Sequence, residues 1–154
     1  MFRLGPINER LNKVFLCDKI CLGIQELYEF NYMNIYQQEL LDHFHNPRHK
    51  GQLSQVDFAC ELHNPSCGDS ISWQGCLHEG LISSLAFQGK GCVISQAVAS
   101  MLAQQFHGQS IQAIQDCTVA TLVAMIGIDL GPTRLKCALL PLQALQKAVS
   151  HQSL

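Results

Sequence analysis

The chain has 154 residues, of which 47% are hydrophobic and 14% are charged, so it can bury the core of one globular domain. Its net charge of -2 and its scattered basic residues disfavour nucleic-acid binding, and no apolar run approaches the roughly 20 residues of a membrane span. The sequence also lacks the apolar core of a signal peptide, which indicates a reducing cytoplasm. In that compartment eight cysteines favour metal binding or sulfur chemistry over disulfides.

Residues 1–32 are predicted to be an N-terminal extension outside the core domain, which we expect to span residues 33–154. Apolar residues in the extension are compatible with one helix, on which Cys17 and Cys21 would lie one turn apart. Such a pair could bind a metal, but the simpler interpretation is that the segment is dispensable.

A first helix is predicted after Asn34, which can cap it, and it should end at Asn46-Pro47 because a residue before proline avoids the helical region. Three histidines cluster near its end: His43, His45 and His49. They could form a metal site, although imidazoles on the polar face of a helix end are more commonly solvated. We therefore interpret them as solvated side chains.

Three strands are predicted next, over residues 56–62, 70–76 and 81–87, because apolar and polar residues alternate there. Their short connections predict an antiparallel meander with helices on one face, which is an α+β fold. Cys60 and Cys76 fall inside this sheet and are interpreted as structural residues.

The remaining sequence predicts helices over residues 93–106, 110–115 and 118–126, followed by a loop over 127–133. Cys117 should be buried or inert between two of them. A last helix should run from near Cys137 to about His151. Pro141 suits a first turn but not a helix interior, so this helix should either start after Cys137 or be kinked.

Three cysteines occupy the edges of predicted elements. Cys67 lies on an exposed turn with Asp69 two residues later, and Cys92 directly precedes a helix whose dipole favours a thiolate. Cys137 would lie at the edge of the last helix. The separations of 25 positions (92 minus 67) and 45 positions (137 minus 92) exclude a zinc finger with paired knuckles. The edge positions favour a joint site, but the spacing alone does not force the three thiols together.

Four motifs resemble one known family, and they occur in its order. They are Asp42-His43-Phe44-His45-Asn46-Pro47-Arg48, Asn64-Pro65-Ser66-Cys67-Gly68-Asp69, Gly89-Lys90-Gly91-Cys92 with the small-residue helix after it, and Arg134-Leu135-Lys136-Cys137-Ala138. Over about residues 34–150 the chain is similar to the U-type iron-sulfur assembly proteins, the group of IscU, the NifU N-terminal domain and SufU. The resemblance implies a small three-stranded antiparallel sheet packed against several helices. It also implies that Cys67, Asp69, Cys92 and Cys137 converge and bind a transient [2Fe-2S] cluster, or zinc.

Two departures bear on the branch of this family. Scaffold members carry a histidine before the third cysteine and a Leu-Pro-Pro-Val-Lys loop for a chaperone, whereas this chain has Lys136 and the loop Leu130-Gly131-Pro132-Thr133-Arg134. Both differences point toward SufU. However, the SufU branch is expected to carry an insertion of about 20 residues between the second and third cysteines. This chain has no such insertion. The chain is intermediate between the two branches.

The function that the resemblance implies is a scaffold rather than an enzyme. It would accept sulfur from a cysteine desulfurase and iron from an iron donor, build the cluster and pass it to apo-proteins. The alternative is a zinc-dependent sulfurtransferase, and a third possibility is a structural zinc module. We expect a monomer or a weak homodimer. Cys137 is the expected persulfide acceptor because Lys136 and Arg134 would favour its anion, and Asp69, a hard ligand, should make the site leaky.

Overall fold

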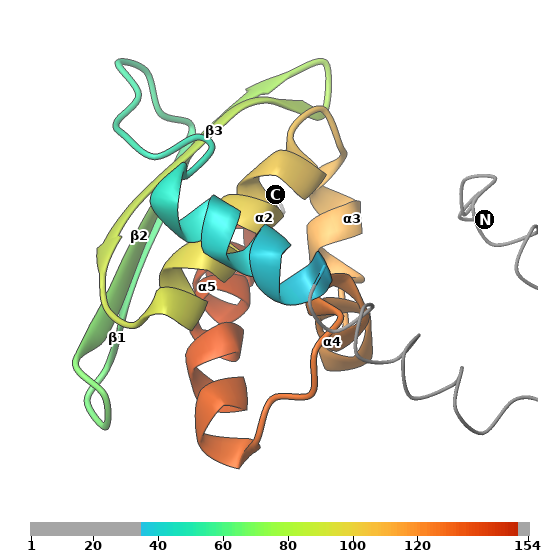
Figure 1. Ribbon diagram of the computed structural model, residues 1–154. Coiled ribbons are helices and arrows are strands. Elements are labelled where there is room, and N and C mark those ends of the chain that lie inside the picture. Colours follow the sequence, from blue (N-terminus) through green and yellow to red (C-terminus); the bar gives the residue numbers. More distant parts are fainter. Residues whose placement is uncertain (1–34, 151–154) are drawn as a thin grey trace, which may run out of the picture. The chain divides into compact units, whose positions relative to one another are not determined.

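A computed structural model describes residues 35–150, and it begins with a helix over residues 35–45 (Figure 1). The elements that follow are β1 (Phe58–Asn64), β2 (Asp69–His78), β3 (Leu81–Lys90), α2 (Val93–Phe106), α3 (Ile111–Gln115), α4 (Val119–Ile126) and α5 (Pro132–Ser150). Residues 1–34, and with them the expected cap Asn34 and the Cys17–Cys21 pair, lie outside the described part. No helix within residues 35–150 is long and apolar enough to cross a membrane.

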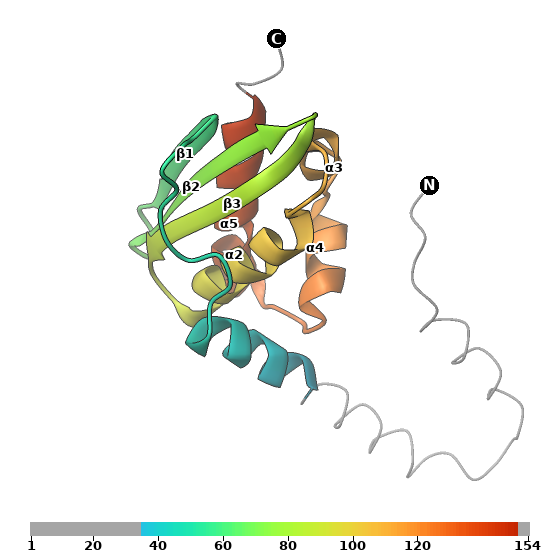
Figure 2. The ribbon, with the colours of Figure 1, turned by 90° about the horizontal axis from the view of Figure 1, so that it is seen from above.

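The sheet has the order β1-β2-β3, and both pairings are antiparallel. Its inner face carries Phe58, Ile71 and Trp73, which alternate with more exposed residues as the sequence pattern predicts. Both ribbon views show the helices gathered on this one face (Figures 1 and 2). The predicted α+β fold is confirmed. The strand boundaries differ by up to three residues: β1 begins at Phe58 and leaves Val56 exposed before it, and all three strands end two or three residues later than predicted.

Helix α2 lies in the middle of the domain and contacts both β3 and α5. Half of its buried side chains are alanine or serine, including Ala97, Ala99 and Ala103, so its backbone can approach the neighbouring elements closely there. The predicted bounds of 93–106 are confirmed. Because α2 begins immediately after the end of β3, its N-terminus lies at the edge of the sheet where β2 starts.

Helix α5 starts at Pro132, so the prediction of a start near Cys137 is wrong. Proline is favourable in the first turn because the amide it lacks would have no helical partner there, and the first helix bond runs from Leu135 N to Gly131 O. Pro141 lies inside the helix. Its carbonyl accepts a hydrogen bond of 2.9 Å from Trp73 Nε1, which ties the helix to the centre of the sheet.

The first helix and the loop that follows it are both attached to Ser100 of α2. His43 is buried, and its Nδ1 lies 2.8 Å from Ser100 Oγ on α2. The same oxygen accepts the backbone N–H of Arg48 at 2.7 Å, so the hydroxyl proton is available for His43. The interpretation of all three clustered histidines as solvated is therefore wrong for His43, while His45 and His49 are exposed.

Candidate metal and sulfur site

Cys67 lies in the turn that joins β1 to β2. The turn is closed by the Asn64↔Asp69 pair, by a bond of 2.9 Å from Gly68 N to Asn64 O, and by the left-handed backbone of Gly68 (φ 73°). The Asn64 side chain also accepts the Ser66 N–H at 3.0 Å. Cys67 is exposed at the tip, as the sequence predicts.

Asp69 is the first residue of β2, and only 2% of it is exposed, so the exposed turn predicted around Cys67 does not extend to Asp69. The reason is the close approach of Gly91, where a Cβ atom would lie 2.5 Å from Asp69 Cγ. Asp69 Oδ1 accepts the Cys92 N–H at 3.1 Å. Burial raises the pKa of this carboxyl, but hydrogen bonds from Cys92, Cys67 and Ser95 outweigh it and hold the pKa below its usual range.

Cys92 is the N-cap of α2, which confirms its predicted place at a helix edge. Its Sγ accepts the Ser95 N–H at 3.4 Å and lies 3.6 Å from Ser95 Oγ. The sequence analysis did not single out Ser95, although the backbone N–H of the third residue after a cap is a usual donor to the cap side chain. The Cys92 thiol is therefore turned toward its own helix.

Cys137 lies inside α5 rather than at its edge, and only 8% of it is exposed. Burial, together with the neighbouring Cys92 and Cys67 thiols, raises the pKa of Cys137 to about 12. The expectation that Lys136 and Arg134 favour its anion is wrong for the metal-free protein. A cation that bound the sulfur directly would reverse this, because metal-bound thiols are deprotonated.

Three of the four expected ligands lie together. Ligand atoms of Cys67, Asp69 and Cys137 are all within 4.8 Å of one another, whereas Cys92 lies outside this group. Two sulfur ligands of one zinc ion lie at most about 4.6 Å apart, because each zinc–sulfur bond is about 2.3 Å long. Small movements of the side chains would therefore bring the ligand atoms to bonding distance of one ion. Asp69 Oδ2 is buried and has no hydrogen-bond partner. Two thiols and an unpartnered carboxylate oxygen are a donor set that fits zinc or iron.

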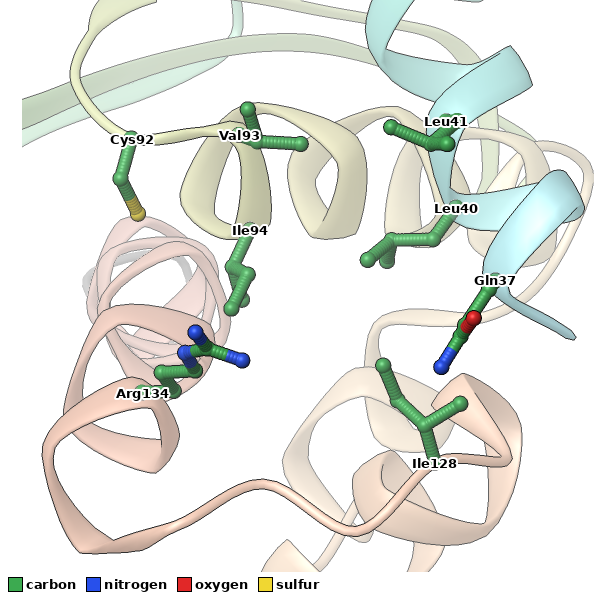
Figure 3. A pocket seen from close by; sticks show the side chains of 8 residues that line it. All are labelled: Gln37, Leu40, Leu41, Cys92, Val93, Ile94, Ile128 and Arg134. Atoms are coloured by element: carbon green, nitrogen blue, oxygen red, sulfur yellow. The ribbon is translucent and has the colours of Figure 1, made fainter. Parts of the chain in front are cut away.

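An apolar groove of about 450 Å³ borders the site (Figure 3). Cys92 lies at one end of it, and the Arg134 side chain points into it. Residues from the first helix, from the start of α2, from the segment before α5 and from the first turn of α5 form its walls. The lining residues are Gln37, Leu40, Leu41, Cys92, Val93, Ile94, Ile128 and Arg134. Leu41 and Val93 are among the exposed large hydrophobic residues of the described part, 47% and 37% exposed.

Comparison with known proteins places the chain in a family. Residues 35–153 match the model of the NifU-like N-terminal domain. The zinc-dependent sulfurtransferase SufU of Bacillus subtilis (strain 168) is 30% identical over 142 residues, which cover 81% of this chain and 96% of that protein. The iron-sulfur cluster assembly scaffold protein IscU of Streptococcus pyogenes serotype M1 is 32% identical over 139 residues, or 78% of this chain and 86% of that protein.

A solved structure has the same fold. The N-terminal part of a nitrogen-fixing NifU-like protein from Brucella abortus superposes with a TM-score of 0.61 at 20% identity, and the match covers 79% of this chain and 97% of that one. The four motifs, the sheet with helices on one face, and the match over residues 35–153 agree. The chain therefore belongs to the NifU-like N-terminal domain family, the U-type proteins of iron-sulfur cluster assembly.

Proposed function

We propose that this protein accepts persulfide sulfur from a cysteine desulfurase and that an external thiol reductant, such as excess cysteine, reduces this sulfur to sulfide. The sulfide then combines with iron in a transient [2Fe-2S] cluster, which the protein passes to apo-proteins. The observation that carries the proposal is the meeting of Cys67, Asp69 and Cys137 within 4.8 Å, with Cys92 beside them. The four side chains come from a turn, a strand, a helix cap and a helix interior, so each is held by a separate element.

The sulfur step is an exchange between two thiols. A thiolate of this protein attacks the terminal sulfur of the desulfurase persulfide, a new S–S bond forms, and the desulfurase cysteine leaves as a thiolate. We propose Cys137 as the acceptor. A zinc or iron ion bound by the four residues would supply the charge that deprotonates this buried thiol. In the metal-free protein the exposed Cys67 competes with it as the acceptor.

The groove supports a protein donor rather than a free small molecule. Its apolar walls and the Arg134 cation fit an extended segment of the desulfurase that carries the anionic persulfide. A segment lying along Leu41 and Val93 would end at Cys92, directly beside the proposed acceptor site.

The second candidate is a zinc-dependent sulfurtransferase, in which zinc stays on the protein and only sulfur moves. Lys136 before Cys137 favours it, as does the similarity to the Bacillus subtilis enzyme of that description. In both cases the four ligands and the acceptor are the same. The two candidates differ only in what the site carries after sulfur has arrived.

Anaerobic incubation with a cysteine desulfurase, cysteine and Fe²⁺ tests the proposal. Visible absorption bands of a cluster, formed in proportion to the protein, would support the scaffold. A persulfide on Cys137 in the zinc-loaded protein, without cluster bands, would support the sulfurtransferase. Neither product at any cysteine would contradict both.

We further propose that residues 33–154 suffice for this function. All four proposed ligands, of which Cys67 is the first in the chain, lie well after residue 32, and the family match begins at residue 35. A protein lacking residues 1–32 should therefore keep both metal binding and sulfur acceptance. Loss of either in a soluble truncated protein would assign residues 1–32 to the functional domain.

A further inference from the structure

Two imidazoles meet at the end of α2 that is opposite Cys92. His107 is the C-cap residue of α2, and its ring centre lies 5.1 Å from that of His49, with the two planes tilted by 35°. Both residues are exposed. A helix of 14 residues is about 21 Å long, so this pair is remote from the thiol site.

The backbone on both sides of the pair is fixed. The left-handed conformation of His49 (φ 60°) is held by β3, because Phe87 N donates to His49 O at 3.0 Å and Phe87 O accepts from Gly51 N at 2.9 Å. His107 N donates to Ala103 O at 3.2 Å, and the next residue, Gly108, donates to Ile82 O at 2.8 Å. The two rings are therefore presented by a preorganised scaffold.

The separation of the rings suits chelation. With a metal–nitrogen distance of about 2.1 Å, each ring centre lies about 3.2 Å from the ion. A nitrogen–metal–nitrogen angle between about 90° and the tetrahedral value then separates the two centres by about 4.5 to 5.2 Å. The observed separation is 5.1 Å. We propose that His49 and His107 form a second metal site, which binds a late first-row divalent ion through two imidazoles and completes its coordination with water.

Nickel titration of the zinc-loaded full-length protein tests the site, because zinc then occupies the thiols. Ni²⁺ should broaden the ring proton resonances of His49 and His107 together, at lower concentrations than those of the other histidines. Loss of a group that only hydrogen-bonds to a metal ligand typically lowers metal affinity by about 10–100-fold. Loss of a ligand itself, as in His49→Asn or His107→Gln, should therefore weaken Ni²⁺ binding by at least about tenfold. Asparagine tolerates the left-handed backbone at position 49.

The matched controls are His45→Gln and His63→Gln, which replace exposed histidines outside the pair. Both should leave Ni²⁺ affinity unchanged. Zinc content and circular dichroism would show that each variant is folded and that the thiol site is still loaded. Equal Ni²⁺ affinity in wild type, His49→Asn and His107→Gln, or broadening of only one of the two rings, would overturn the proposal.

Discussion

Both ends of α2 carry side chains that can bind a metal ion, but these side chains differ in how far they are buried. At the N-terminal end, Asp69 and Cys137 are buried around the Cys92 cap, and a carboxylate oxygen is left without a partner. At the C-terminal end, His49 and His107 are exposed to water. Leaving a buried polar group unsatisfied costs about 1–3 kcal/mol, whereas an exposed imidazole loses nothing.

This difference predicts different roles for ions at the two ends. An ion at the N-terminal end would satisfy Asp69 and deprotonate a buried thiol, so its binding should be coupled to the stability of the fold. An ion at the C-terminal end would replace only water. The comparison teaches that burial of the ligands, more than their identity, decides whether a metal contributes to folding.

The largest expected effect is the loss of a sulfur ligand at the N-terminal end. Loss of a group that only hydrogen-bonds to a metal ligand lowers metal affinity by about 10–100-fold. Cys67→Ser and Cys137→Ser remove the ligands themselves, so each should weaken zinc binding by at least about 100-fold. Equilibrium dialysis against a zinc indicator would measure this. Cys76→Ser is the control, because its thiol contacts the Gln55 carbonyl instead. Unchanged affinity in either ligand variant would contradict the assignment of the site.

The groove should affect sulfur transfer without affecting metal binding. Leu41→Asp places a charge on its apolar wall and Arg134→Glu reverses its cation, so each should slow persulfide transfer from the desulfurase by about tenfold. Mass spectrometry of the acceptor over time would measure the rate. Val119→Asp is a matched control, since Val119 is 46% exposed and Leu41 is 47% exposed. Equal slowing by Val119→Asp would show that the effect is not specific to the groove.

Removing the oxygen ligand should lengthen the life of an assembled cluster. A carboxylate binds the iron of a cluster less well than a thiolate does and can be displaced by an acceptor, so Asp69→Ala should slow decay of the cluster chromophore by a few fold. Transfer to an apo-ferredoxin should slow in parallel. Faster decay than wild type would instead assign Asp69 a purely structural role through its bond to Cys92.

The smallest effect concerns the attachment of the first helix midway along α2. Burial, followed by the Arg48 charge, lowers the pKa of His43 from its ordinary value of 6.5. The folded protein therefore binds this proton more weakly than the unfolded chain does, so the contribution of His43 to stability is present above pH 6.5 and decreases as the pH falls below it. Urea unfolding between pH 7.5 and 5 should show the decrease.

A His43→Gln variant should flatten this pH dependence, and His45→Gln should leave it intact. The same slope in the His43→Gln protein would assign the acid sensitivity to another group.

The strands and the first helices were predictable because their patterns are local. Alternation located all three strands, and the helical period with a final glycine located α2. The burial of Asp69 was not predictable, because it depends on the approach of Gly91 from 22 positions away. The start of α5 was misplaced because residues 127–133, which include Gly131 and Pro132, were interpreted as a loop, whereas Pro132 is the first residue of the helix. The hydrogen bond between the Pro141 carbonyl and Trp73 was not predictable, because it depends on tertiary structure.

The histidines illustrate the same limit. His43, His45 and His49 cluster in the sequence, but their partners are unrelated: His43 contacts Ser100, His45 packs against Phe44, and His49 faces His107. The distance between His49 and His107 is 58 positions along the chain, and no spacing rule connects them. A cluster in the sequence therefore did not identify a cluster in space.

Pro141 has a consequence for the way Cys137 is held. Because proline has no N–H, the carbonyl of Cys137 lacks the donor that a regular helix would supply four residues later. The turns of α5 before Pro141 are thus joined to the rest of the helix by one bond fewer, while Trp73 secures the helix at Pro141 itself. Such a segment can open as a local unit while the remainder stays folded, so its amides should exchange with deuterium faster than those after Pro141. Local opening of this kind would expose the Cys137 thiol without unfolding the domain.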